Sequence, residues 1–410
     1  MVFVTVKKTI LFLYPDKFTN FEYYKFEFSQ LKKKYKFNII INDLSNLIHN
    51  QRLNLIWKSK RYKKAILFSS IKDWIFFFNK IKKKNIIIFN FASQNYSLNS
   101  LIIKIFLKLS KKTVFIDRQS NHEIPVKKNI SWLLSKFYEH GFNYKVYFFY
   151  FRDYFFRFLM SFVKYEKSFV LLSDYVSKIN NKKNSIININ QTDYSNYLLF
   201  KKNKKKNKKK YILYLDNGGP FFTGDAELTG HKSSTNSWSR INMDSYFKNL
   251  MFFFKKLEKH FKANIIVIPH PKYKSSNKKI KSFNPYFKNN IVNNDVDALS
   301  KLSRNALFFI TEYTTAVAFA VACYKPVVCI TSSKHNFSEN NKKAIMDQDK
   351  NLGITPFDIS NFNIKKINKI LKINKSKYEN YKYKHLTTKK ENVERKPNYK
   401  IIGDFIRDNV

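Results

Sequence analysis

The chain has 410 residues, enough for two domains, and its hydrophobic fraction of 44% is ample for a sizeable core. Aromatic residues make up 18% of it, which excludes a disordered chain, while 7 glycines, 9 prolines and 2 cysteines exclude collagen-like proteins, disulfide scaffolds and cysteine zinc modules. The net charge is +48, and Lys, Asn, Ile, Phe and Tyr are all abundant. This composition is typical of a protein encoded by an AT-rich gene. We therefore interpret much of the lysine excess as solvated surface.

The N-terminal half alternates strand-like apolar segments with amphipathic stretches, the pattern of α/β layers. Helices are predicted over residues 21–34, 71–82 and 98–109. The predicted strands are Thr9–Tyr14, Phe37–Ile41, Ala65–Ser69, Asn85–Phe89, Val114–Asp117, Phe169–Ser173 and Ile186–Ile189.

The segment from Phe142 to Val163 is rich in aromatic residues and also carries Arg152 and Arg157. Two interpretations stay open: a helical insertion buried against its domain, or a surface that lies in a lipid interface. No stretch of ~18–20 uncharged apolar residues occurs, so no spanning helix is predicted. The first seventeen residues do not have the pattern of a signal peptide.

A Lys-rich run over residues 201–210 has no apolar residue and is predicted to be a linker. It divides the chain into an N-terminal domain over 1–200, with a helical insertion at about 120–165, and a C-terminal domain over 211–410 that ends in a basic helical tail. In the second half, helices are predicted over 244–262, 296–303 and 315–323. The strands are Tyr211–Leu215, Asn264–Ile268, Ala306–Ile310 and Val327–Ile330. The predicted fold class is α/β and GT-B-like: two doubly wound, Rossmann-like parallel-sheet domains facing a cleft.

Ligands of open parallel sheets bind at the carboxyl ends of the strands, and the loop after Leu215 is the first candidate there. Four of the seven glycines cluster in this loop, which permits close approach of backbone to a ligand. Its acidic residues are candidate acid/base groups. The candidates are Asp216, Asp225 and Glu227 for catalysis, and Gly218, Gly219 and Gly224 for donor binding.

Two more loops qualify in the second half. His270 stands between Pro269 and Pro271 directly after a predicted strand, and with Lys272 it could hold or protonate a phosphate. The loop from residue 311 to 316 brings Glu312 and two threonines to the start of a predicted helix, where backbone N–H groups bind anions. Ordinary N-capping by Thr314 or Thr315 explains the same residues.

Weaker candidates follow strands of the N-terminal half. Asp16, His122 and Glu123 would lie at the carboxyl edge of that sheet and could contact an acceptor. No metal-binding motif with the usual spacing of His, Cys or acidic residues is present, so we predict that no metal or other cofactor is required.

The run from Tyr211 to Ile330 resembles the nucleotide-sugar-binding half of bacterial surface-polysaccharide glycosyltransferases of GT-B type. The matching pieces are the strand with D-x-x-x-P and GDAEL, the helix FFFKKLEKHF, IPHPK, and TEYTTAVAFAVACYKPVV. The H-P motif and the hydroxyl pair are also similar to sialyl- and Kdo-transferases that use CMP-sugars. The resemblance implies His270 and Thr314/Thr315 at the donor phosphate, and Asp216, Asp225 or Glu227 as the base.

Other interpretations stay open. The same pieces resemble CDP-glycerol glycerophosphotransferases, and a sugar-nucleotide 2-epimerase is also GT-B-like, although its denser set of His, Glu and Asp is not found here. A non-catalytic basic protein that binds nucleic acid or an anionic membrane would explain the charge, but not the glycine cluster.

The favoured prediction is a metal-independent glycosyltransferase of the cell envelope, acting in capsule or lipopolysaccharide biosynthesis. It would move a sugar from a nucleotide-sugar, with CMP-sugars among the donors, to a surface polysaccharide or lipid-linked glycan. Its partners would be this donor, the glycan acceptor and, through peripheral contact, the anionic inner face of the cytoplasmic membrane. No nucleic-acid module leaves a signature in the sequence, so nucleic acid is not an expected partner.

Overall fold

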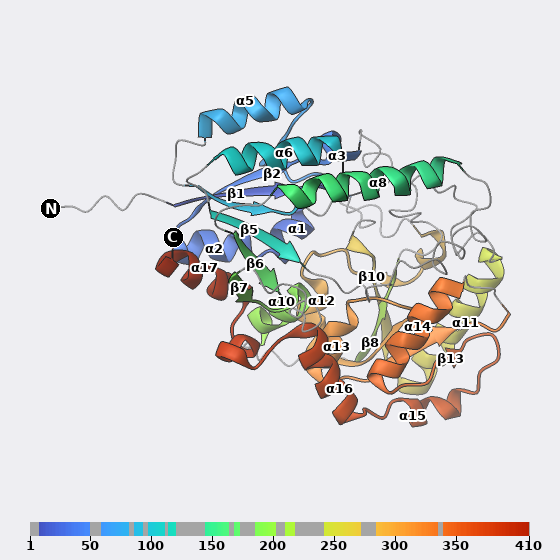
Figure 1. Ribbon diagram of the computed structural model, residues 1–410. Helices are drawn as coiled ribbons and strands as arrows, with labels where there is room; N and C mark the ends of the chain where they lie inside the picture. The colour runs from blue at the N-terminus through green and yellow to red at the C-terminus, as the bar shows by residue number, and fades with distance from the viewer. Residues whose placement is uncertain are drawn as a thin grey trace. The chain divides into compact units, whose positions relative to one another are not determined.

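The computed structural model describes residues 8–49, 59–81, 86–92, 97–110, 114–119, 144–163, 168–172, 185–201, 210–217, 242–271, 284–334 and 339–409. These residues form two compact units (Figure 1). Unit 1 contains the described residues up to Asn190 and again from Lys390 onward. Unit 2 contains the described residues from Gln191 to Lys389.

Unit 1 is built on a seven-stranded sheet with the order β3-β2-β1-β4-β5-β6-β7. Neighbouring strands pair in parallel throughout. The strands are β1 (Thr9–Tyr14), β2 (Asn38–Asp43), β3 (Ala65–Leu67), β4 (Ile86–Asn90), β5 (Val114–Gln119), β6 (Ser168–Leu172) and β7 (Ser185–Asn188).

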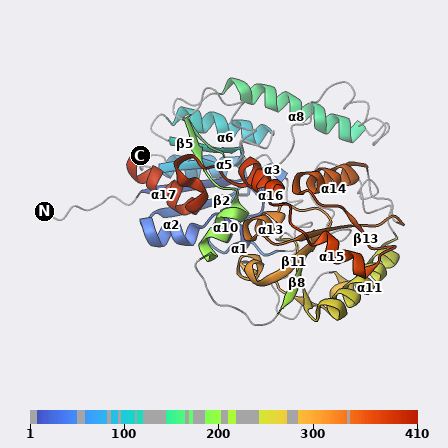
Figure 2. The ribbon, with the colours of Figure 1, turned by 90° about the horizontal axis from the view of Figure 1, so that it is seen from below.

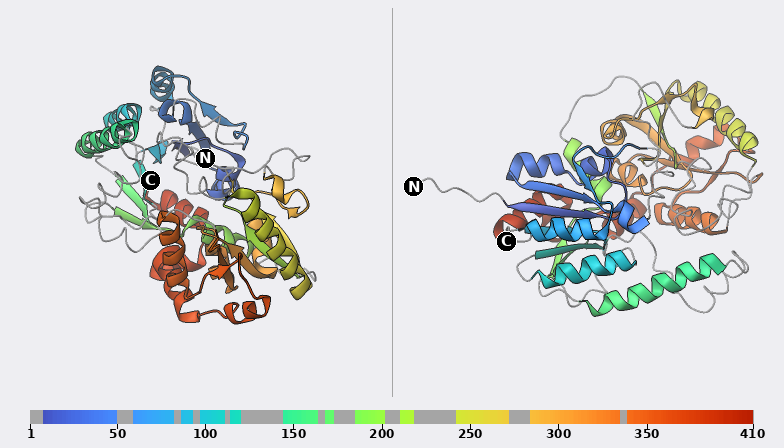
Figure 3. Two further views of the ribbon diagram at one scale, coloured as in Figure 1. Left: turned by 90° about the vertical axis from the view of Figure 1, so that its right-hand side faces the viewer. Right: turned by 90° about the horizontal axis from the view of Figure 1, so that it is seen from above.

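Helices cover both faces of this sheet (Figures 1 and 3). Because successive side chains of a strand point to opposite faces, Ile10 and Phe12 pack with α2 and α17, whereas Leu11 and Leu13 pack with α5 and α6. The helices are α1 (Asn20–Lys25), α2 (Phe28–Tyr35), α3 (Ser45–His49), α5 (Ile71–Ile81), α6 (Leu98–Leu109), α8 (Tyr144–Phe162), η10 (Lys390–Arg395) and α17 (Asn398–Asn409).

The single helix expected over residues 21–34 is two helices, α1 and α2. Glu27 interrupts them, because its backbone adopts a left-handed conformation with φ 56°. The Glu27 side chain is buried and accepts a hydrogen bond of 2.8 Å from the backbone N–H of Tyr399 in α17. A contact across more than 370 residues of sequence therefore decides where the helix breaks, and local periodicity did not predict it.

Unit 2 is built on a six-stranded parallel sheet with the order β10-β9-β8-β11-β12-β13. The central strands are buried nearly completely, as their continuous apolar sequences predict. The strands are β8 (Tyr211–Leu215), β9 (Asn264–Ile268), β10 (Ile291–Val292), β11 (Ala306–Thr311), β12 (Val327–Thr331) and β13 (Phe357–Asp358).

Unit 2 also has helices on both faces of its sheet. The long helix α11 (Met243–Phe261) packs on one face, and α10 (Thr192–Phe200), α12 (Ala298–Leu302) and α13 (Val317–Cys323) pack on the other. Figure 2 shows α10 beside α13. The other helices are α14 (Glu339–Leu352), α15 (Ile367–Ile370), α16 (Lys375–Tyr381), η6 (Pro285–Phe287), η7 (Ser303–Asn305), η8 (Ile364–Lys366) and η9 (Lys382–Leu386).

Two doubly wound parallel sheets agree with the predicted fold class, but the division of the chain differs from the expected one. Residues 192–200, expected to end the first domain, form the helix α10 and belong to unit 2, because Tyr194 and Tyr197 are buried against α13. Helix α17, expected in the C-terminal domain, belongs to unit 1, because Ile406 completes the core beside α2. Of the predicted linker, residues 202–209 lie outside the described part of the chain.

The expected helical insertion contains α8, which packs against α6 (Figure 3). Lys104 of α6 donates a hydrogen bond of 2.8 Å to the backbone carbonyl of Met160. Residues 120–143 of the insertion lie outside the described residues. Among the helices that the structure describes, none combines the length and apolar character needed to cross a membrane.

Gly403 provides a test of how tightly α17 packs on unit 1. A Cβ atom at this position would lie 2.3 Å from Cε2 of Tyr35, whose hydroxyl donates to Asp404. We expect Gly403→Ala to lower the free energy of unfolding by about 1–3 kcal/mol, because the Tyr35 ring has to move. Urea denaturation measures the change. Lys400→Ala, an exposed position of the same helix, should shift it by less than about 0.5 kcal/mol, and equal effects would contradict the tight packing.

Candidate functional site

The order of the unit 2 strands places a reversal point between β8 and β11. Counted along the unit, the order is 3-2-1-4-5-6, so the chain first builds outward through β9 and β10 and then returns to build from β11 in the other direction. Helix α11, which follows β8, lies on one face, and α13, which follows β11, lies on the other. The loops after β8 and β11 therefore diverge, and ligands of open α/β sheets bind at such a point.

Asp216 and His270 both lie at this carboxyl edge, on adjacent strand ends. Asp216 follows β8 directly, and its backbone N–H donates a hydrogen bond of 3.0 Å to the carbonyl of Ile268 in β9. This bond continues the pairing of the two strands and brings Pro269 level with Asp216. Asp216 is 7% exposed, whereas His270 is half-buried. The same edge thus carries a half-buried histidine and a largely buried aspartate.

The loop after β11 supplies two threonines to the same edge. Thr314 is anchored from both sides: its backbone N–H donates to Oε1 of Gln348 at 3.3 Å, and its hydroxyl accepts from the N–H of Ala316 at 3.2 Å. Thr315 is exposed, and α13 begins two residues later at Val317. The Thr314 hydroxyl therefore stabilises the turn before the helix. The N-cap residue of α13 is Ala316 and no side chain caps the helix, so the N-capping interpretation of Thr314 or Thr315 is wrong.

Glu312, expected to contact a donor, is instead buried, with 2% of its surface exposed. Its Oε1 accepts hydrogen bonds from the hydroxyls of Tyr214 at 2.8 Å and Tyr246 at 2.7 Å. Burial raises the pKa of Glu312, and burial beside Glu312 raises the pKa of both tyrosines well above the usual value. Oε2 has no hydrogen-bond partner among the described residues. The Glu312 carboxyl therefore ties β11 to β8 and α11 through Oε1.

A second buried polar group lies behind the threonine loop on α14. Nε2 of Gln348 donates to Sγ of Cys329 at 3.1 Å, and Asp349 beside it is 3% exposed. Burial raises the pKa of Asp349 to about 6, although the neighbouring Cys329 thiol acts to lower it. Sequence analysis did not identify these residues, because nothing in the polar sequence of α14 indicates which carboxylate points inward.

The remaining expected residues of this site cannot be placed. Gly218, Gly219, Gly224, Asp225, Glu227 and Lys272 lie outside the described residues. Within the described residues, no group of three or more His, Cys, Asp or Glu side chains is arranged to hold a metal ion.

In the unit 1 sheet the strand order also reverses, between β1 and β4. One residue predicted to lie at the carboxyl edge of this sheet, Asp16, forms an ion pair there. Asp16 follows β1, and its Oδ1 lies 3.0 Å from Nε2 of His49 at the end of α3. Next to this pair, Asp43 is fully buried and binds Nε of Arg61 at 2.6 Å. His49 was missed because it lies 33 residues further along the chain. His122 and Glu123 lie outside the described residues.

Comparisons with known proteins give structural likeness only. No protein-family model and no curated protein matches the chain. The UDP-GlcNAc 2-epimerase from Methanocaldococcus jannaschii is 13% identical, with a TM-score of 0.46 and coverage of 98% of this chain and 100% of that one. The S. aureus MnaA–UDP co-structure is 10% identical, with a TM-score of 0.48 and coverage of 98% and 96%.

A variant of the wall teichoic acid polymerase TagF is 12% identical, with a TM-score of 0.48 and coverage of 98% of this chain and 88% of that one. At identities of 10–13% and TM-scores of 0.46–0.48, these likenesses identify no shared activity. The function therefore has to be argued from the residues at the carboxyl edge of the sheet.

Asp349 provides a test of the polar cluster behind this edge. The pKa of the Asp349 carboxyl is raised from 3.8 to about 6 in the folded protein. Between pH 3.8 and about pH 6 the folded protein therefore binds more protons than the unfolded chain does. The free energy of unfolding consequently falls as the pH rises through this range. We expect Asp349→Asn to raise the free energy of unfolding by about 1–3 kcal/mol at pH 7.5 and by less at pH 4.5.

Urea denaturation at the two pH values measures this difference. Asp347→Asn, two residues earlier on α14 and less deeply buried, is the matched control and should show no comparable gain at pH 7.5. A gain for Asp349→Asn that is the same at both pH values would contradict the raised pKa.

Proposed function

We propose that this protein is a transferase that binds a nucleotide-activated donor at the carboxyl edge of the unit 2 sheet. The activated group would be a sugar, and the acceptor would be a glycan or a lipid-linked glycan. One observation carries the proposal: Asp216, His270 and Thr315 follow three adjacent strands, β8, β9 and β11, at the point where the strand order reverses.

His270 and Thr315 suit the phosphate of the donor. A half-buried imidazole can donate a hydrogen bond or a proton to a phosphate oxygen, and an exposed hydroxyl before a helix can donate a second one. Lys272 would add a positive charge two residues after His270. Such donors stabilise the negative charge that develops on a leaving phosphate, so the proposed reaction requires no metal.

The base would be a carboxylate of the glycine-containing loop. Asp216 is the candidate within the described residues, and Asp225 and Glu227 are the alternatives. The carboxylate would take the proton of an acceptor hydroxyl, whose oxygen would then attack the anomeric carbon as the bond to the nucleotide phosphate breaks. In the glycerophosphotransferase alternative, the same oxygen would attack the phosphorus of a CDP-glycerol donor, and CMP would leave.

Nucleotide binding is the first test. We expect one nucleotide among CMP, CDP, UDP and GDP to raise the melting temperature of the full chain, because a ligand that binds only the folded state stabilises it by mass action. His270→Ala should abolish the rise, whereas His260→Ala, which removes an exposed histidine of α11 in the same unit, should retain it.

The identity of the stabilising nucleotide separates the enzyme alternatives. CMP alone would support a CMP-sugar donor, and CDP would support the glycerophosphotransferase. A nucleotide that stabilises Asp216→Asn as well as the wild-type chain, with transfer lost, would support Asp216 as the base. Stabilisation by none of the four, together with salt-sensitive binding of oligonucleotides, would contradict the transferase and favour a non-catalytic basic protein.

The surface of α8 supports an acceptor at a membrane. Besides the exposed Tyr154, five exposed aromatic side chains recur at intervals of three and four residues, which places these five on one face of the helix. Between 46% and 68% of the surface of each is exposed. We call this row the aromatic stripe: Phe148, Phe151, Phe155, Phe158 and Phe162. A buried insertion would not expose such a row, so of the two interpretations of this segment the interfacial surface fits better.

Charge favours an anionic lipid surface as the occupant of the stripe. Arg152 and Arg157 are exposed on the same helix. On α5, the ammonium of Lys80 lies 4.0 Å from the ring centroid of the exposed Phe76. Aromatic rings bordered by cations suit the boundary between acyl chains and anionic headgroups. Peripheral contact of this kind would bring a lipid-linked acceptor to unit 1.

Vesicle co-sedimentation tests this contact. We expect the chain to bind vesicles that contain phosphatidylglycerol and to bind phosphatidylcholine vesicles much more weakly. Phe151→Ser with Phe158→Ser should weaken binding about tenfold or more, because each buried ring contributes roughly 1.5–3 kcal/mol. Phe252→Ser, which removes a similarly exposed ring from α11, should leave binding unchanged. Equal binding to both lipids, or an undiminished double variant, would contradict the proposal.

A further inference from the structure

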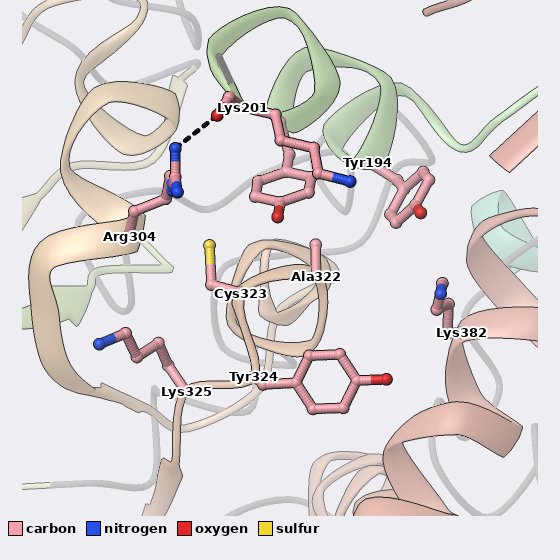
Figure 4. Close-up of a pocket in the computed structure, with 9 residues that line it drawn as sticks. Tyr194, Lys201, Arg304, Ala322, Cys323, Tyr324, Lys325 and Lys382 are labelled. Atoms are coloured by element: carbon pink, nitrogen blue, oxygen red, sulfur yellow. Dashed lines mark hydrogen bonds between the residues drawn. The ribbon is translucent and has the colours of Figure 1, made fainter. Parts of the chain in front are cut away.

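Unit 2 contains a cavity of about 450 Å³ at the edge of the sheet opposite the candidate donor site (Figure 4). Arg304 lies two residues before β11 and Lys325 lies two residues before β12, so both mark the amino ends of these strands. The end of α13, the end of α10 and the start of η9 form the other walls. We call this cavity the basic pocket.

Four cationic side chains line the basic pocket: Lys201, Arg304, Lys325 and Lys382. No acidic residue is among those that line it. Arg304 presents a planar fork that matches phosphate oxygens, and the lysines add compact charges around it. Figure 4 shows Arg304 and Lys325 on one side and Lys382 on the other. The arrangement suits an anion with more than one negative charge.

The cations are not fully used by the protein's own negative groups. Helices α10 and α13 both end at this pocket, and each helix end carries roughly half a negative charge. Arg304 donates a hydrogen bond of 2.5 Å to the carbonyl of Lys201 at the end of α10, and Lys382 lies 3.9 Å from Glu379. Two half charges and one carboxylate against four cations leave a positive balance of about two charges.

Tyrosines on α10 make the inner wall of the pocket rigid. Tyr194 and Tyr197 are 4% and 9% exposed, with ring centroids 6.0 Å apart. Burial raises the pKa of Tyr197, so its hydroxyl remains protonated and is a hydrogen-bond donor at neutral pH. The exposed Tyr324 lies on the opposite side. The pocket therefore combines fixed donors with an excess of positive charge.

We infer that the basic pocket is a binding site for a multiply charged phosphate group, separate from the proposed donor site. The two sites lie at opposite ends of α13, because Thr315 precedes this helix and Cys323 ends it. The seven residues of α13 span about 10 Å. Binding at one site should therefore leave the other physically accessible, and the inference does not depend on the proposed transferase activity.

Pyrophosphate is the probe that tests this site. We expect saturable binding of one pyrophosphate per chain by isothermal titration calorimetry with His270→Ala, a variant that removes the imidazole of the proposed donor site. Adding Lys201→Gln and Lys325→Gln should weaken binding about tenfold, because two of the four charge-assisted contacts are lost. Neither lysine makes a side-chain hydrogen bond within the described residues, so these substitutions should not disturb folding.

Lys255→Gln with Lys259→Gln in the same background is the matched control. Both lysines are exposed on α11, and the two substitutions remove the same total charge as the pocket pair. Equal weakening by the two pairs would overturn the inference and indicate non-specific attraction to a basic protein. Absence of saturable binding before the lysines are changed would also overturn it.

Cys323 provides a reporter at the pocket itself, because the other cysteine, Cys329, is fully buried. Its sulfur points toward the Arg304 side of the pocket (Figure 4). Burial raises the pKa of Cys323 to about 12, so its alkylation by N-ethylmaleimide is slow and is followed at alkaline pH. We expect pyrophosphate to slow it several-fold further, as measured by mass spectrometry of the intact chain. Unchanged alkylation at saturating pyrophosphate would place the binding elsewhere and overturn the inference.

Discussion

In each unit the first strand lies inside the sheet rather than at its edge, and the placement of the candidate residues depends on this constraint. β1 has β2 and β4 as neighbours, and β8 has β9 and β11. Because crossover connections between parallel strands are right-handed, a chain that builds outward on one side of its first strand and then on the other must place its helices on opposite faces. The loops at the reversal point diverge, and this leaves Asp216 and Thr315 at the same edge of the sheet although 98 residues separate them.

The carboxyl edge of unit 2 also concentrates buried polar groups that an apolar core would not contain. Glu312 accepts hydrogen bonds from two tyrosine hydroxyls. Asp349 lies beside the Cys329 thiol, and burial raises the pKa of the Asp349 carboxyl to about 6. Such groups cost stability unless they are paired, so their position behind the threonine loop is informative. Glu312 fixes the end of β11 relative to β8 and α11, and Gln348, the neighbour of Asp349, holds Thr314 before α13. Such rigidity is what a binding site requires.

The large positive charge indicates a binding partner only where cationic side chains gather at one place in the structure. A surplus of lysine spread over the surface indicates no particular partner. In the basic pocket, four cations surround one cavity without an acidic residue in its lining. On α8, arginines accompany a row of exposed aromatic rings. The proposed partners, a compact phosphate and an anionic lipid surface, are each inferred from such a local feature and not from the total charge of the chain.

Sequence alone determined the seven strands of the unit 1 sheet, four of the six strands of the unit 2 sheet, and the edge at which the candidate residues lie. The predicted bounds of β1, β8, β9 and α6 coincide with the observed ones, because apolar period and breaker residues act locally. Asp216, His270, Thr314 and Thr315 were predicted as site residues because each stands in a loop just after a predicted strand, and the structure places these loops at the carboxyl ends of β8, β9 and β11. Only the tertiary structure decided that α17 returns to unit 1, that Glu27 breaks a helix and that Glu312 is buried under Tyr214 and Tyr246. It also paired Asp16 with His49 and gathered the cations of the basic pocket, because contacts between distant segments have no local signal in the sequence.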